Sequence, residues 1–273
     1  MFAALFRTAF VALCALTLTA CASGYKEFYR PMAGATPERI AATRAGPPPA
    51  TPALERVATS DMQVVADQYT KRGYGLIGFS SFNSGEAPSD SAALTHGAEV
   101  KADLVVILNP RYTGSVTSAV PITVPTTTPS FSTGTATAYG PGGPVTAYGS
   151  GTTTTYGTST TMVPITVNRQ DFGAAYFVKR KWSFGIVPRD LTDDERRALQ
   201  SNRGLAVRLV VEGTPAFNED ILPGDLVTEI DGLPVANVAA LGPMLQEREG
   251  RRINVTIVRN GVRLAKSVQL ASS

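Results

Sequence analysis

The residues of this chain with the most reactive side chains are few: two cysteines, Cys14 and Cys21, and one histidine, His96. A structural zinc site needs four cysteine or histidine ligands, and a disulfide framework needs several cysteine pairs. Neither can be built from this set, and the sequence contains no phosphate-binding loop and no dinucleotide fingerprint. The chemistry to consider is therefore modification of Cys21 and proton transfer by His96.

Cys21 follows a segment with the layout of a secretory signal peptide, which we place at residues 1–20. Arg7 precedes an apolar run that is shorter than the roughly 20 residues needed to span a bilayer, and small residues follow it. The segment Leu18–Cys21 (LTAC) resembles the lipobox of bacterial lipoproteins. That resemblance implies cleavage before Cys21, acylation of its sulfur and of the new amino group, and attachment to a membrane through the acyl chains.

The same resemblance bears on location. Ala22, rather than an aspartate, follows the cysteine, which by the sorting rules of enterobacterial lipoproteins favours the outer membrane, and we expect the periplasmic face. Each buried CH₂ group of an acyl chain contributes about 0.8 kcal/mol, so three chains give near-permanent attachment. Because Cys14 would leave with the signal peptide and Cys21 would carry lipid, a cysteine nucleophile is excluded.

The elements behind the anchor fall into a tether and a small folded unit. Residues 21–53 are rich in Pro, Ala and Gly, which predicts an extended tether. Residues 54–111 predict a small α/β unit with a strand at Tyr74–Phe79 and a buried strand at Ala102–Leu108. A first helix, with the capping pattern Ser60–Gln63, has one apolar side available from Leu54, Val57, Val64, Val65 and Tyr69. A second helix runs from Pro88 to about Lys101, and strand, helix and strand in this order imply a right-handed βαβ crossover.

Residues 112–168 contain no Asp, Glu, Lys or Arg and are dominated by Thr, Gly, Ser and Pro. The sequence Val-Pro-Ile-Thr-Val occurs at 120–124 and again at 163–167, on either side of a Pro-Gly-Gly-Pro turn. Thr and Tyr favour strands, so we predict a long two-stranded β-arm with the two copies facing each other at its base. An unstructured low-complexity loop over residues 126–161 remains an alternative. A membrane-inserting hairpin is disfavoured by the prolines at 121, 125, 129 and 164.

After a connecting strand at 169–181, three blocks of sequence stand in a fixed order. They are Phe184–Ile186, then Gly213–Val235 with its Gly-Asp and Asp-Gly turns, then Ile253–Gly261. Together they resemble a bacterial PDZ domain of the type found in periplasmic trypsin-like heat-shock proteases, which we place at 182–273. This resemblance implies a partly open β-barrel with helices, and the whole chain is expected to be an α+β protein.

The PDZ resemblance also implies a groove that binds peptides. Phe184, Gly185 and Ile186 would supply backbone amides for a C-terminal carboxylate and the mouth of a pocket. Val238, Leu241 and Leu245 are three and four residues apart, so they share a helix face that would line the pocket. Apolar helix residues also commonly face a core, and residues 187–203 form an insert long enough to cover the groove.

A PDZ domain often accompanies a protease, so catalysis needs a test. The segment Asn83–Gly85 is faintly similar to the nucleophile loop of trypsin-like proteases. In that family the catalytic histidine precedes the serine, whereas His96 follows Ser84. In addition, only about 130 residues lie ahead of the PDZ region, which is too few for the two β-barrels of such a protease. Nothing marks a Ser-Lys dyad. We therefore expect a non-enzymatic binding protein without cofactors.

A net charge of +3 over 273 residues, without a basic cluster, excludes a nucleic-acid partner.

Two functional hypotheses follow. In the first hypothesis, the PDZ groove captures C-termini or extended segments of envelope proteins. In the second, a structural or surface-displayed lipoprotein makes its contacts through the Thr/Tyr-rich arm, and a degenerate protease is less favoured than either. An open groove favours the first, whereas a groove filled by Thr192–Asn202 or by the arm favours the second.

Overall fold

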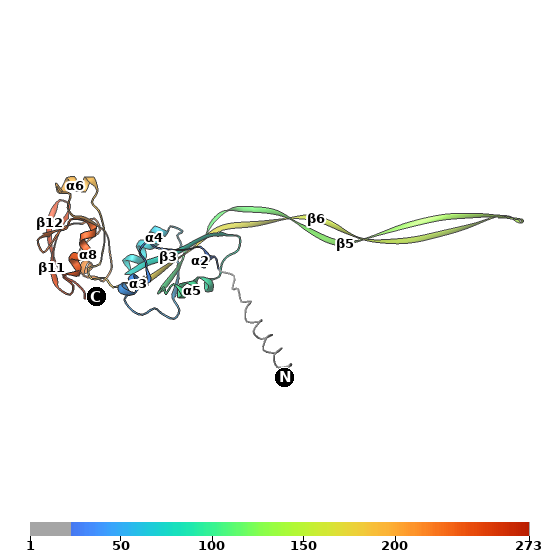
Figure 1. The fold of residues 1–273 in the computed structure, drawn as a ribbon. Coiled ribbons are helices and arrows are strands. Elements are labelled where there is room, and N and C mark those ends of the chain that lie inside the picture. The colour runs from blue at the N-terminus through green and yellow to red at the C-terminus, as the bar shows by residue number, and fades with distance from the viewer. Residues whose placement is uncertain (1–22, 273) are drawn as a thin grey trace, which may run out of the picture. The chain divides into compact units, whose positions relative to one another are not determined.

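A computed structural model describes residues 23–272 of the chain (Figure 1). The expected signal peptide and Cys21 lie outside the described residues. The chain divides into two compact units: the arm, Tyr112–Arg169, and the remainder. The predicted α+β class is confirmed, with a mixed N-terminal sheet, a long β-hairpin and an antiparallel C-terminal sheet. Within the described range, no helix has the length and apolar character needed to cross a membrane.

The N-terminal sheet has the strand order β1-β3-β6-β4-β2. Its strands are β1 (Tyr29–Pro31), β2 (Ala53–Arg56), β3 (Tyr74–Ser84), β4 (Leu104–Ile107) and the last third of β6 (Gly143–Lys179). β6 is antiparallel to both β3 and β4, and β2 is parallel to β4. The predicted strands before and after the second helix, β3 and β4, therefore run in the same direction, but β6 lies between them.

Two helices cover opposite faces of this sheet: α4 (Met62–Lys71) and α5 (Asp90–Glu99). All four residues of β4 are buried. Val105 packs in the cluster that contains Ala93 of α5, whereas Val106 packs with Val65 of α4. Successive side chains of a strand point to opposite faces, so a strand covered on both sides must be apolar throughout.

The boundaries of the first helix differ from the sequence expectation. Asp61, not Ser60, is its N-cap, because the Asp61 carboxylate accepts hydrogen bonds from the backbone amides of Gln63 and Val64. Leu54 lies in β2 rather than on the helix. The second helix begins as predicted, with the Ser89 hydroxyl accepting from the amide of Ala92.

The segment expected to be an extended tether is partly folded onto the sheet. It contains α2 (Gly24–Glu27), β1 and α3 (Pro37–Thr43), and β1 pairs with β3. Tyr25 is 1% exposed and lies edge-on to Phe82, with 5.2 Å between the ring centroids. The average composition of the segment is that of a linker, but its two tyrosines bury enough apolar surface to order the chain around them.

The arm is a hairpin of two long twisted strands, β5 (Arg111–Gly140) and β6 (Figure 1). The structure therefore contradicts the alternative of an unstructured loop over residues 126–161. Thr117 Oγ1 lies 2.8 Å from Thr166 Oγ1, and Thr123 Oγ1 lies 3.0 Å from Thr160 Oγ1.

This pairing places Val120 opposite Val163, so the two Val-Pro-Ile-Thr-Val copies meet only at their ends. The prediction that they face each other is wrong, because the turn between Gly140 and Gly143 sets the register of the hairpin.

The C-terminal sheet is antiparallel, with the order β12-β11-β9-β8-β7, and the short β10 pairs with β9. Its strands are β7 (Ile186–Arg189), β8 (Leu205–Val210), β9 (Leu226–Ile230), β10 (Leu233–Pro234), β11 (Arg252–Arg259) and β12 (Val262–Gln269). The helices are α6 (Asp193–Leu199), α7 (Pro215–Asn218) and α8 (Val238–Gln246). Asp231 and Asn260 have positive φ angles in the turns predicted there. β7 lies at the edge of this sheet, which leaves its outer side unpaired within the sheet.

Candidate functional site

The loop that leads into β7 is held in place by its carbonyl groups. The Phe184 carbonyl accepts from the amide of Ala216 and the Gly185 carbonyl from the amide of Val211, each at 2.9 Å. Gly185 has φ +99°, and a Cβ atom there would overlap the side chain of Thr214. A glycine is therefore required, because a side chain would both strain the backbone and displace Thr214.

The backbone N–H groups of the same loop, unlike its carbonyl groups, do not form hydrogen bonds within the described chain. Among residues 23–272, the backbone N–H groups of Phe184 and Gly185 donate to no protein acceptor. Both residues are buried, and buried amides normally have a hydrogen-bond partner. Two such donors at the beginning of an edge strand can donate hydrogen bonds to an anionic group such as a carboxylate.

The structure brings the predicted side chains of the groove together. Phe184, Ile186, Leu241 and Leu245 belong to one buried cluster, and Val238 packs against it partly exposed. Leu241 is 5% exposed and Leu245 8%, so both leucines are part of the domain core as well as of the expected pocket. A charged residue at Leu241 would therefore disrupt the core, whereas Val238 is only partly buried.

Sequence reasoning did not single out two residues beside the expected groove: Pro188 in β7 and Asp190 just after it. Pro188 lies within the edge strand opposite Val207 of β8. The N–H and C=O groups of Val207 bond to Asp225 and Gly224, away from β7, so the nitrogen of Pro188 also points away from β8. The outer side of β7 therefore lacks one donor that an added strand would use. Asp190 Oδ1 lies 3.5 Å from the backbone nitrogen of Val238, which brings the end of β7 close to the beginning of α8. The proline was visible in the sequence, but its position on an edge strand was not.

The insert at 187–203 does not fill the space beside α8. Leu199 of α6 packs with Leu191, Ala206 and Leu226. Ala206 alternates in β8 with Leu205 and Val207, which belong to the cluster that contains α8, so α6 covers the opposite face of the sheet. An ion pair between Arg189 and Glu195 (2.6 Å) holds the insert there, and the hydrogen bond from Arg189 lowers the pKa of Glu195 to about 2.

His96 lies in the N-terminal unit and is 5% exposed. Its ring packs against Tyr29 and Tyr176, with 4.7 and 5.2 Å between centroids, and its Nδ1 lies 3.2 Å from Glu99 Oε2. Its Nε2 is buried and has no hydrogen-bond partner among residues 23–272. This ring is packed as a core side chain and is not open to a substrate.

Comparison with known proteins identifies the C-terminal part of the chain. Residues 183–270 match the PDZ domain family. These residues form a PDZ domain. The match covers less than half of the chain, and no curated protein matches the chain.

The solved structures similar to this chain include an HtrA-type protease and the PDZ domain of an HtrA protein. One is a variant of the HtrA-type protease AlgW with a decapeptide, at 22% identity and a TM-score of 0.31, covering 33% of this chain and 28% of that chain. Another is the HtrA3 PDZ domain bound to a phage-derived ligand, FGRWV, at 20% identity and a TM-score of 0.29, covering 32% of this chain and 82% of that chain. The chain thus spans under a third of the length of the AlgW variant.

Proposed function

We propose that this protein is a non-enzymatic, membrane-anchored lipoprotein of the periplasm that uses its PDZ groove to bind C-termini or extended segments of envelope proteins. The lipobox at Leu18–Cys21 supports the anchor in the outer membrane. PDZ domains typically bind the C-termini of peptides, which supports the choice of ligand. The core packing of the single histidine supports the absence of catalysis.

One observation carries the peptide-binding part of the proposal. The Phe184 and Gly185 amides have no acceptor in the described chain, and they lie where edge strand β7 begins. A peptide that extends β7 would place its terminal carboxylate at these amides. Its last side chain would lie against Val238, above the buried leucines of α8.

The test uses a peptide of known sequence and a change in the ligand. Because a PDZ domain of an HtrA protein binds FGRWV, we expect this peptide to bind here with micromolar affinity, near −8 kcal/mol. The same peptide with an amidated C-terminus should lose binding, since the carboxylate supplies the charge that the amides recognise. Isothermal titration calorimetry of the purified chain measures both.

Two variants on α8 supply the matched control. Val238→Ala removes part of the exposed wall and should weaken binding several-fold, whereas Ala239→Ser, exposed on the same helix, should not. Equal affinity for the acid and the amidated peptide would contradict carboxylate recognition. No binding of FGRWV or of a library of peptides with apolar C-terminal residues would contradict the groove altogether.

A second candidate function rests on the arm. Paired residues of an antiparallel hairpin share a face, and successive residues alternate between faces. One face of the arm therefore collects an apolar stripe of residues that are each 37–55% exposed: Val116, Val120, Ile122, Val124, Val163, Ile165 and Val167. The prolines at 121, 125, 129 and 164 all lie on the other face, at positions whose missing N–H groups point outward.

These features favour a contact through the face of the arm rather than through its edges. Proline removes the edge donors that a new strand would need. The stripe carries no charge, so two identical stripes stack without repulsion, and a hairpin of two strands is marginally stable alone. The partner that fits best is the arm of a second copy of this chain.

A further inference from the structure

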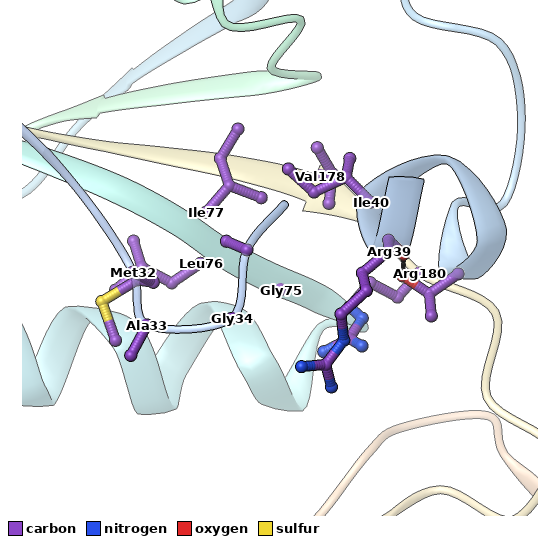
Figure 2. Close-up of a pocket in the computed structure, with 12 residues that line it drawn as sticks. Met32, Ala33, Gly34, Arg39, Ile40, Gly75, Leu76, Ile77, Val178 and Arg180 are labelled. Carbon is purple, nitrogen blue, oxygen red and sulfur yellow. Dashed lines mark hydrogen bonds between the residues drawn. The ribbon is translucent and has the colours of Figure 1, made fainter. Parts of the chain in front are cut away.

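A cavity lies on the N-terminal sheet, between that sheet and the segment that the sequence predicts to be a tether (Figure 2). Residues 32–43, including α3, lie over β3 and the end of β6 and enclose about 190 Å³. Its lining residues are Met32, Ala33, Gly34, Ala35, Arg39, Ile40, Thr43, Gly75, Leu76, Ile77, Val178 and Arg180. Most of the lining residues are apolar, but polar atoms of the backbone, of Thr43 and of the two arginines make up most of the surface that the cavity exposes.

The two arginines are not neutralised by the protein. No acidic residue lines the cavity. Within residues 23–272, neither guanidinium forms an ion pair or a side-chain hydrogen bond. The Arg180 side chain packs against Gly75, and its Cζ lies 5.6 Å from the ring centroid of Trp182. Burial lowers the pKa of Arg180, and the nearby charge of Arg39 lowers it further. Bringing two like charges together in a partly buried space costs free energy unless an anion joins them.

Each arginine lies against a glycine that leaves room for it. A Cβ atom on Gly75 would overlap the Cδ of Arg180, and a Cβ on Gly34 would lie 2.7 Å from Nη1 of Arg39. Gly34 also has φ +76°, which a larger residue rarely adopts. The backbone therefore accommodates both side chains at the cavity, where Figure 2 shows them.

We propose that this cavity binds a phosphate monoester with a short apolar substituent. Two uncompensated guanidiniums match the charge of a phosphate group, and guanidinium binds phosphate through paired hydrogen bonds. Ile77 and Val178 provide the apolar surface for the substituent. The volume equals roughly six water molecules, enough for the phosphate and a few carbon atoms.

The same chemistry has two sources: a free phosphate monoester, or the phosphate headgroup of an anionic membrane lipid. Propyl phosphate is the probe for the first and vesicles of phosphatidylcholine with added phosphatidic acid for the second, with pure phosphatidylcholine as reference. Calorimetry measures binding of propyl phosphate, and co-sedimentation measures binding to vesicles. Trp182, the single tryptophan of the chain, gives an independent fluorescence signal beside Arg180.

We expect propyl phosphate to bind more tightly than inorganic phosphate, and 1-propanol not to bind. Arg39→Gln and Arg180→Gln should each weaken propyl phosphate binding at least tenfold. Arg30→Gln changes an exposed arginine of β1 outside the cavity and should leave it unchanged. Arg39 is exposed, so its variant keeps the test valid if the Arg180 variant proves unstable by circular dichroism.

Three outcomes would overturn the proposal. They are no binding of either probe, inorganic phosphate binding as tightly as propyl phosphate, and an equal loss of affinity in the Arg30 variant. Binding of FGRWV should be the same in the Arg39 variant and the unmodified chain, so failure at this cavity is distinguishable from failure of the peptide groove. Whichever probe binds more tightly identifies the source of the phosphate.

Discussion

Arg72 and Glu55 show how single side chains join elements in the N-terminal unit. The Arg72 guanidinium donates to both carboxylate oxygens of Glu55, at 2.8 and 2.9 Å, and the Tyr69 hydroxyl donates to Glu55 Oε2 at 2.6 Å. These bonds connect the end of α4 to β2. The hydrogen bonds from Arg72 lower the pKa of Glu55 to about 2, and burial, followed by Glu55, raises the pKa of Tyr69 to about 12.

This cluster predicts an acid-dependent loss of stability. The pKa of Glu55 is lower in the folded chain than its ordinary 4.5, so its contribution is present above about pH 4.5 and is lost as the pH falls towards 2. Because the carboxylate is 38% exposed, we expect about 0.5–1 kcal/mol, the range for solvent-screened pairs. Thermal unfolding of Glu55→Gln between pH 7 and 2 should show lower stability at neutral pH and a smaller decrease in acid. Glu86→Gln, at an exposed position, is the control, and an unchanged acid slope in Glu55→Gln would contradict the assignment.

At the scale of elements, β7 and the arm show two uses of proline on a strand edge. In β7 a single proline interrupts the side on which a peptide would pair, and the register between β7 and β8 shifts beside it. In the arm, repeated prolines keep the edge of β5 from pairing while leaving its ladder to β6 continuous. The N–H group that proline lacks therefore removes one hydrogen bond from a peptide pairing with β7, and in the arm it restricts association to the faces of the hairpin.

Pro188→Val restores an outward N–H group on β7. We expect FGRWV to bind about two- to thirteenfold more tightly, because one added hydrogen bond contributes about 0.5–1.5 kcal/mol. Calorimetry of this variant is compared with Pro234→Val, which changes an exposed proline of β10. Unchanged affinity in Pro188→Val would show that the peptide does not pair with β7.

The apolar stripe of the arm predicts self-association that a single charge abolishes. Val120 and Ala119 are adjacent but lie on opposite faces of the hairpin. Val120→Lys places a charge in the stripe and should shift the chain to the monomer in sedimentation velocity, whereas Ala119→Lys should not. A monomer at all concentrations for the unmodified chain would contradict the second candidate function.

At the scale of the whole molecule, the proposed lipid anchor would hold the PDZ domain at the surface of one membrane. A domain that binds with micromolar affinity gains occupancy when its partners are held at the same surface, because the effective concentration rises. The proposed weak groove and the proposed lipid anchor are therefore consistent with each other. The proposed phosphate site in the N-terminal cavity would be a separate binding site on the same chain.

Cys21→Ser tests the anchor. The variant should lose incorporation of a fatty-acid probe and leave the membrane fraction or accumulate as an uncleaved precursor. Cys14→Ser, the other cysteine of the chain, should keep both labelling and location. Labelling that survives in Cys21→Ser would disprove lipidation at this residue.

The sequence by itself determined what depends on local pattern. Several features could be predicted from residues that are neighbours in the sequence. They are the turn dipeptides, the apolar run of β4, the Ser89 cap and the blocks Phe184–Ile186 and Ile253–Gly261. The α+β class followed from them, and the residues of the groove stay a prediction.

Only the tertiary structure decided what depends on contacts between distant segments. Tyr25 orders the expected tether because Phe82, far along the chain, receives its ring, and β6 separates β3 from β4 because the arm returns between them. Three further features have the same origin: the burial of Leu241, the edge position of Pro188, and the presence of both Arg39 and Arg180 in the lining of one cavity. Composition averages and local spacing contain no information about which distant side chains meet, and that is set by packing of the whole sheet.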